Sequence, residues 1–292
     1  MRGAAGSLVA QPRTVTTPAP VAQRRRERAE NFPVALRLLP AELRADLHAI
    51  YGVARAIDDL GDEAAGDRLA LLDGFDADLQ RVWRAEPDPE HPTLRPLVGT
   101  VRRHDLPIGP FQALIEANRV DQVRSSYPTW AELRGYCALS AEPVGRLVLL
   151  VLDAATPERV ALSDDVCTAL QLLEHCQDVG EDRRRGRTYL PLADLRAHGV
   201  SRTDLDLPVT SYAVRRLLAA EVARAEALLA SGPPLVRSLT GAGRWAVAGF
   251  VAGGFATVEA LRHCDFDVLA AAPRPSRSAT VRHAARLVGS RA

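Results

Sequence analysis

The chain has 292 residues, of which 47% are apolar and 25% are charged, a composition that is ordinary for a globular protein and excludes a disordered or low-complexity polymer. Its 37 basic and 36 acidic residues leave a formal net charge of +1, so no overall field attracts nucleic acid and any anion site must be local. Four cysteines without a CxxC pair favour neither a disulfide framework nor a zinc site, as expected of a protein in the reducing cytoplasm.

The two ends of the chain are expected to differ from its centre. Residues 1–24 mix Pro, Thr, Ser and Ala without a secretory signal, so we predict a disordered tail there. We predict one globular domain over residues 25–272 and a basic C-terminal tail over residues 273–292. The longest uncharged stretch near the C-terminus, residues 245–258, is too short for the ~20 apolar residues that span a bilayer.

Apolar residues recur with helical spacing and no strand-like alternation is found, so the sequence predicts an all-α protein. A first helix should run from Pro40 into the acidic segment 58–62, and a second should cover residues 68–84. Helices over 93–104 and 110–123 follow. A further helix should begin near Thr129 and kink between residues 140 and 146, where Pro143 removes a backbone donor.

The second half of the chain is predicted to be helical as well. Ser163 should cap a helix that ends at Asp182, just before the basic segment 183–187. The remaining helices are expected over 210–231, 234–239 and 242–269. Because the predicted connections are short, we expect a single helical bundle.

Two acidic residues close the first helix. Asp58 and Asp62 are four residues apart and therefore lie on one helical face, which continues the apolar stripe of that helix. Like charges on a buried face are costly unless a divalent cation with oxygen ligands neutralises them. The alternative is that the helix frays at Gly61 and both carboxylates are solvated.

The same arrangement recurs in a second helix. Asp178 and Asp182 are four residues apart, and Gln171 and Glu174 precede them on the same face. A solvent-facing polar ridge is the alternative, but recurrence on two helices favours a site. Facing each other across a cavity, the two pairs could hold several Mg²⁺ ions that share phosphate oxygens of a substrate.

Basic and aromatic residues accompany these acidic pairs. Arg55 precedes the first pair, and residues 183–187 with Tyr189 follow the second, where they could contact a diphosphate or form ordinary salt bridges. The apolar wall between the pairs, or equally a plain core, would include Phe32, Tyr51 and Tyr136. No P-loop or GxGxxG motif follows a strand, which excludes the common nucleotide-binding sites.

Several segments together resemble the squalene and phytoene synthases, the head-to-head branch of the all-α isoprenoid synthases. The resemblance covers about residues 30–268 and is nearest to the hydroxysqualene-forming enzymes of the hopanoid pathway. It rests on residues 30–34 (ENFPV), 38–40 (LLP), Tyr51 with Arg55, 58–62 (DDLGD), 136–137 (YC), 143–146 (PVGR), 169–172 (ALQL), 177–182 (QDVGED) and 186–191 (GRTYLP).

The resemblance implies a single-domain bundle with a central hydrophobic channel. It implies Mg²⁺ held by Asp58, Asp62, Asp178 and Asp182, with Tyr189 acting at the reaction centre. Substrate contacts would come from Phe32, Tyr51, Arg55, Tyr136, Gln171, Glu174 and Arg187. By the nearest branch, presqualene diphosphate and water would give hydroxysqualene and diphosphate without NADPH.

Two other functions stay open. The same fold could join two prenyl diphosphates head to head, giving presqualene diphosphate, squalene or phytoene. A non-catalytic binding or assembly protein is the alternative of another class, and Glu174, where the resembling family usually has Asn, is its best support.

The expected partners follow from the same hypothesis. An isoprenoid diphosphate is the predicted ligand, other enzymes of squalene and hopanoid synthesis are candidate protein partners, and no nucleic acid is expected. The arginines of the C-terminal tail lie among Val281, Leu287 and Val288 and could form a basic amphipathic segment at the inner face of the membrane. A solvated tail is the alternative.

Overall fold

Helices make up nearly all of the ordered architecture of this chain. The structure is a computed structural model that describes residues 39–84 and 88–289. In those two ranges the only β-type pairing is an isolated parallel bridge between Ser126 and Thr188. The predicted all-α fold is confirmed, whereas Phe32 and the predicted tail over residues 1–24 lie outside the described residues.

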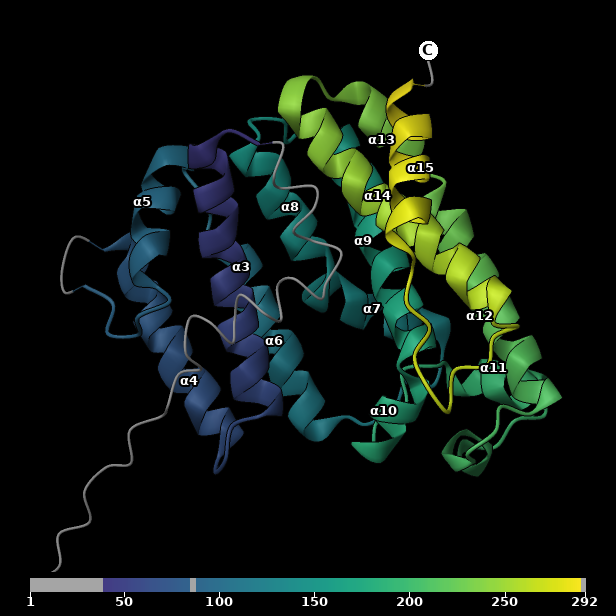
Figure 1. The fold of residues 1–292 in the computed structure, drawn as a ribbon. Coiled ribbons are helices and arrows are strands. Elements are labelled where there is room, and N and C mark those ends of the chain that lie inside the picture. The colour runs from purple at the N-terminus through teal and green to yellow at the C-terminus, as the bar shows by residue number, and fades with distance from the viewer. Residues whose placement is uncertain (1–38, 85–87, 290–292) are drawn as a thin grey trace, which may run out of the picture.

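The helices are connected by short loops and pack into one bundle (Figure 1). In chain order they are α3 (Ala41–Asp62), α4 (Arg68–Leu79), the 3₁₀ helix η1 (Gln80–Trp83), α5 (Arg95–His104), α6 (Gly109–Val123), α7 (Trp130–Ser140), α8 (Glu142–Val151), α9 (Pro157–Gln177), α10 (Val179–Arg184), α11 (Leu192–Ala197), the 3₁₀ helix η2 (Arg202–Asp206), α12 (Tyr212–Leu229), α13 (Gly232–Ser238), α14 (Gly241–His263) and α15 (Arg277–Gly289).

Helix α9 is the centre of this arrangement. It packs against α7, α8, α12, α13 and α14, and it continues into α10 at its C-terminal end. On one side, α3, α4, α5, α6 and α8 enclose a core in which Leu47, Val53 and Ile57 of α3 are almost fully buried. On the other side, α9 shares its core with α12 and α14. Both halves of the bundle therefore meet at α8 and α9.

The predicted limits of the helix that carries the second acidic pair are wrong at the start and in the middle. Helix α9 begins at Pro157, because the Thr156 side chain accepts a hydrogen bond from the backbone N–H of Arg159 and caps it there. Ser163 lies buried inside the helix. At the other end the helix stops at Gln177, and Asp178 separates α9 from α10.

The break at Asp178 coincides with a chain crossing. The carbonyl oxygen of Leu269 would lie 2.8 Å from a Cβ atom at Gly180, so only glycine lets the C-terminal segment pass this closely. Gln177 also donates a hydrogen bond to the carbonyl oxygen of Pro273 in the same segment. The segment after α14 is therefore fastened across the start of α10.

Near residue 143 the chain is interrupted where a kink was predicted, but the interruption separates two helices. The backbone leaves the helical region at Ala141, α7 ends at Ser140, and Pro143 lies in the first turn of α8. In the first turn proline has no helical hydrogen bond to lose, so it opens a new helix instead of bending an old one.

The C-terminal part of the chain differs from its prediction. Helix α14 ends at His263, not near residue 269, because Asp265 and Phe266 adopt positive φ angles. Residues 277–289 form α15, which packs against α13 and α14 and buries Ala279 and Leu287, so the solvated-tail alternative is wrong for these residues. Within the described ranges, no helix combines the length and apolar character needed to cross a membrane.

Close contact between α3 and α6 depends on Gly61. A Cβ atom at this position would overlap Asn118 Oδ1 and would lie only 3.1 Å from Asn118 Cβ, so rotation of the Asn118 side chain cannot relieve the overlap. Asn118 in turn donates a hydrogen bond to Asp58. The small residue between the two aspartates thus lets α6 approach the first acidic segment.

We expect Gly61→Ala to destabilise the protein by about 1–3 kcal/mol, because the added methyl group forces α3 and α6 apart. Gly74→Ala is the matched control: Gly74 is also helical, but nothing lies near its Cβ position. That control should be neutral or stabilising by up to ~1 kcal/mol. Chemical denaturation of both variants measures the difference, and equal stabilities would contradict the proposed role of Gly61.

Candidate functional site

The first acidic segment occupies the last turn of α3. Asp58 accepts a hydrogen bond from Asn118 Nδ2 of α6 at 3.3 Å. Asp58 is exposed to water on one side, and desolvation by the neighbouring protein, opposed by Asn118 and Arg55, raises the pKa of Asp58 to about 7. Asp62 is the last residue of the helix and points to a different part of the chain.

The second acidic segment lies where α9 gives way to α10. Asp178 occupies the junction, and the backbone N–H of Asp182 donates to its carbonyl oxygen at 2.9 Å, which preserves helical spacing across the break. Burial, together with the charges of Asp178 and Glu174, raises the pKa of Asp182 to about 8. Burial and Glu181 raise the pKa of Asp178 as well. This end of α9 is therefore a concentrated negative site.

Two arginines connect the acidic segments. Arg187 Nη1 lies 2.7 Å from Asp62 Oδ1. Arg185 lies 3.5 Å from the other oxygen of Asp62 and 2.9 Å from Glu181. The tertiary structure thus brings the end of α3 next to the chain that follows α10, and basic groups lie between the two sets of carboxylates.

Other predicted basic and aromatic residues take separate positions. Arg55 pairs with Asp59 at 3.1 Å and Glu63 at 3.5 Å, on the flank of the first segment. Arg183 forms a bidentate ion pair with Asp206. For this arginine the structure therefore shows the ordinary salt bridge that was the alternative to a diphosphate contact. Tyr51 is half-buried on α3.

Tyr136 and Tyr189 belong to a buried aromatic cluster. Their ring centroids are 5.4 Å apart, and the His175 ring stacks on Tyr189 at 4.2 Å. Desolvation lowers the pKa of His175 to about 3, so the imidazole is neutral. Both tyrosine hydroxyls donate to Asp121 of α6, Tyr136 at 2.6 Å and Tyr189 at 2.8 Å.

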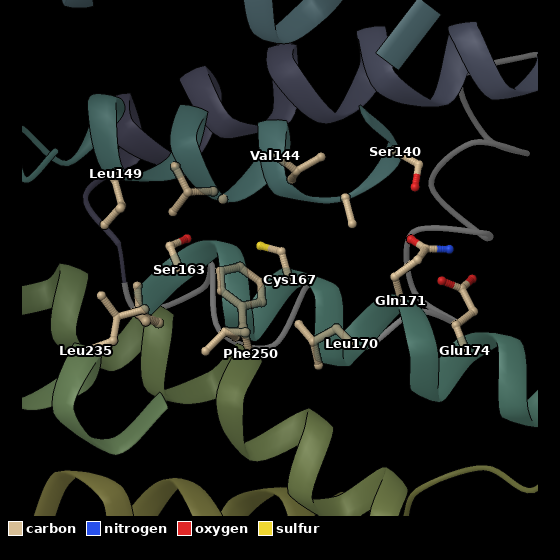
Figure 2. Close-up of a pocket in the computed structure, with 15 residues that line it drawn as sticks. Ser140, Val144, Leu149, Ser163, Cys167, Leu170, Gln171, Glu174, Leu235 and Phe250 are labelled. Carbon is tan, nitrogen blue, oxygen red and sulfur yellow. The ribbon is translucent and has the colours of Figure 1, made fainter. Parts of the chain in front are cut away.

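An apolar cavity of about 210 Å³ begins beside the second acidic segment (Figure 2). Gln171 and Glu174 lie at one end of it, and Leu149 and Leu235 lie at the other end. Its lining residues come mainly from α8, α9, α13 and α14, and they are Ser140, Ala141, Val144, Gly145, Val148, Leu149, Ser163, Val166, Cys167, Leu170, Gln171, Glu174, Leu235, Val247 and Phe250.

Glu174 is the residue that connects cavity and charge. It lines the cavity, and its carboxylate is close enough to Asp182 to raise the pKa of that residue. A ligand with a polar head near Asp182 could therefore place an apolar chain along α9. An amphiphilic molecule suits this arrangement, because the surroundings change from charged to apolar along one helix.

Helix α6 contributes site residues that the sequence analysis missed. Asn118 holds Asp58, Asp121 accepts from both tyrosines, and Gln122 donates to the carbonyl oxygen of Gly61 at 3.0 Å. The three residues are spaced i, i+3 and i+4 and form a polar ridge on a predicted helix. That spacing was the signal available in the sequence.

The carboxylates fit the chemistry of a hard divalent cation. The aspartates occur in pairs, and desolvation and the neighbouring carboxylate charges raise the pKa values of Asp58 and Asp182. Mg²⁺ would neutralise the negative charge of these oxygen ligands. Among the described residues, no three carboxylate, His or Cys side chains converge into a complete metal site. Each pair would therefore need further oxygen ligands from water or a bound diphosphate.

Comparison with known proteins agrees with the geometry. The family model described as Squalene/phytoene synthase matches residues 25–282. The chain is 36% identical over 219 residues to a hydroxysqualene synthase of Rhodopseudomonas palustris, covering 73% of this chain and 72% of that protein. It is 32% identical over 237 residues to a 15-cis-phytoene synthase of Synechococcus elongatus, covering 75% of each.

A solved structure shows the same likeness. The crystal structure of squalene synthase HpnC from Alicyclobacillus acidocaldarius superposes with a TM-score of 0.76 at 40% identity, over 84% of this chain and 94% of that one. Since the family model covers most of the chain and the helical bundle is shared, the protein belongs to the squalene/phytoene synthase family.

Proposed function

We propose that the protein converts presqualene diphosphate and water into hydroxysqualene and diphosphate, with Mg²⁺ as its cofactor and without NADPH. Squalene/phytoene synthases are isoprenoid enzymes, which makes an isoprenoid diphosphate the expected class of substrate. One observation carries the proposal: Arg187 and Arg185 join two acidic segments beside an apolar cavity.

The residues of the site divide the work by their chemistry. Asp58, Asp62, Asp178 and Asp182 would hold Mg²⁺, which supplies positive charge to the departing diphosphate. Arg187 and Arg55 would pair with diphosphate oxygens, and Gln171 would donate to them. Leu149, Leu170, Phe250 and their neighbours would enclose the hydrocarbon and limit the access of water to the cationic carbon skeleton.

A head-to-head prenyl transfer is the second candidate. It is favoured by the comparable identity of this chain to proteins named 15-cis-phytoene synthase. The non-catalytic alternative rests on Glu174, which adds negative charge beside Asp182.

Product analysis distinguishes these functions. Purified protein with Mg²⁺ should release pyrophosphate from presqualene diphosphate and form a hydroxylated thirty-carbon product, identified by mass spectrometry. Formation of presqualene diphosphate, of squalene with NADPH supplied, or of phytoene, from farnesyl or geranylgeranyl diphosphate, would favour prenyl transfer. Absence of turnover with all three substrates by a folded protein would favour the binding protein.

Single carboxylates should be essential for this turnover. We expect Asp58→Asn and Asp178→Asn each to lower kcat/KM by about 100-fold or more, since each removes a negative charge from a proposed metal site. Asp73→Asn is the control, because Asp73 is exposed on α4 and pairs with Arg119. Circular dichroism should show all three variants folded, and full activity of Asp58→Asn would contradict the assignment.

Metal binding should depend on pH in a defined direction. The pKa of Asp58 is about 7 and that of Asp182 about 8 in the metal-free protein, and Mg²⁺ binds the ionised form. Affinity should therefore rise as the pH increases from 6 to above 8, and binding at pH 7 should release protons. Calorimetry in buffers of different ionisation enthalpy measures that release, and a pH-independent affinity would be inconsistent with these ligands.

We also propose a peripheral contact with the inner face of the membrane, through which a hydrocarbon product would reach lipid. Because α15 buries Leu287 and Ala279, the contact would use exposed arginines such as Arg277 and Arg286, not an inserted apolar face. Flotation with anionic liposomes should decrease in an Arg277→Gln, Arg286→Gln variant. Unchanged flotation, or none by the parent protein, would contradict this contact.

A further inference from the structure

Asp121 links the helix that contacts the first acidic segment to the two tyrosines. It lies on α6, three residues after the partner of Asp58, and it accepts hydrogen bonds from the Tyr136 and Tyr189 hydroxyls, one on each carboxylate oxygen. The two tyrosines come from α7 and from the chain after α10, so Asp121 is where three separate segments converge.

Hydroxyl geometry limits what the two tyrosines can do. A phenol has a single proton to donate, and in both residues that proton is directed at Asp121. Each phenolic oxygen can therefore only accept a hydrogen bond from any other group. A diphosphate oxygen is itself an acceptor, so Tyr189 in this arrangement cannot donate to it.

Several neighbouring charges and rings surround the carboxylate. Arg187 and Asp62 both act on Asp121 electrostatically, and the Tyr127 ring lies 5.2 Å from that of Tyr136 and 6.0 Å from that of Tyr189. Tyr136 and Tyr189 are 8% and 6% exposed. With so little freedom, their hydroxyl directions depend on the acceptor that Asp121 provides.

We infer that Asp121 is a positioning residue, which orients Tyr136 and Tyr189 so that their phenolic oxygens accept from water or face positive charge instead of binding the diphosphate. This inference rests on the proposed function and deepens it. In the proposed reaction the C–O bond to diphosphate breaks, a water oxygen forms the new C–O bond to the carbocation, and the extra proton of the captured water passes to the released diphosphate. An oriented phenolic oxygen would accept a hydrogen bond from the incoming water, and electron-rich oxygens would stabilise the cation.

Asp121→Asn is the decisive variant. An asparagine retains one acceptor oxygen but replaces the other with an NH₂ donor, so one tyrosine hydroxyl must turn away. We expect kcat on presqualene diphosphate to fall about 10- to 100-fold, with KM changed less than about threefold, since a hydrogen bond to a charged group is lost and diphosphate contacts remain. The share of product formed without water capture should rise.

Double variants test whether Asp121 acts through the tyrosines. Adding either Tyr136→Phe or Tyr189→Phe to Asp121→Asn should lower kcat little beyond the larger single effect, because the same interaction is removed twice. Glu116→Gln is the control on the same helix, since Glu116 is exposed and pairs with Arg119. It should leave kcat, KM and products unchanged.

A spectroscopic titration tests the contact between Asp121 and the tyrosines without depending on enzyme activity. Burial raises the pKa values of Tyr127, Tyr136 and Tyr189, and the Asp121 charge raises them further. In Asp121→Asn, tyrosinate absorbance near 295 nm should therefore appear at lower pH than in the parent protein, whereas Glu116→Gln should match the parent. If no substrate is turned over by the parent protein, the proposed function fails, but this titration still tests the contact.

Three results would overturn the inference. The first is a tenfold or larger rise in KM with kcat preserved in Asp121→Asn, which would place Asp121 in substrate binding. The second is independent, multiplicative effects in the double variants. The third is an unchanged tyrosine titration, which would show that the carboxylate does not contact the phenols.

Discussion

The ion pair between Arg187 and Asp62 is the contact on which the site depends, because it joins two acidic segments that would otherwise repel each other. Arg185 adds a weaker contact to the same carboxylate. In the free protein these arginines offset part of the negative charge, and desolvation keeps the pKa values of Asp58 and Asp182 near or above neutrality. A bound diphosphate with metal ions would replace one internal ion pair with two kinds of contact, arginine to phosphate and carboxylate to metal.

Helix α9 connects this charged centre to the apolar cavity. Its apolar residues, such as Val166 and Leu170, line the cavity, whereas Gln171 and Glu174 lie at the charged end. Gly145 permits the close packing of α8 on α9, because a Cβ atom there would overlap Ser163 and Cys167. The cavity is thus bounded by helices whose spacing is set by small residues.

Helix α6 stabilises the site through hydrogen bonds from its polar side chains. Its polar ridge contacts α3 through Asn118 and Gln122 and the tyrosines through Asp121. Buried polar networks of this kind cost free energy unless every partner is supplied, so they impose a specific arrangement on the helices that meet there. The segment after α14 adds a further constraint from the other side, where it crosses Gly180. Contacts from α6 and from the segment after α14 therefore hold the acidic segments in place.

Much of this could be predicted from local sequence patterns. Hydrophobic periodicity predicts the all-α fold and puts each acidic pair, spaced i and i+4, on one helical face. The missing N–H of proline predicts the break beside Pro143. Both effects act within a few residues of the chain. Three helix limits could not be predicted, because other effects compete with periodicity there. The choice of cap sets the start of α9 at Pro157, and the chain crossing at Gly180 coincides with the break at Asp178. Positive φ angles end α14.

Tertiary structure alone decided the partners. At Gly254 of α14 a Cβ atom would lie 2.8 Å from Leu170, so this glycine serves the packing of α14 on α9. Several contacts of the site join residues from different elements. They are the pairs Arg183 with Asp206 and Arg187 with Asp62, and the hydrogen bonds of Asp121 with two tyrosines. The sequence by itself determined which residues carry charge at helical spacing, whereas only the packing of distant helices determined which charges meet, because contact energies depend on distance in space and not on separation along the chain.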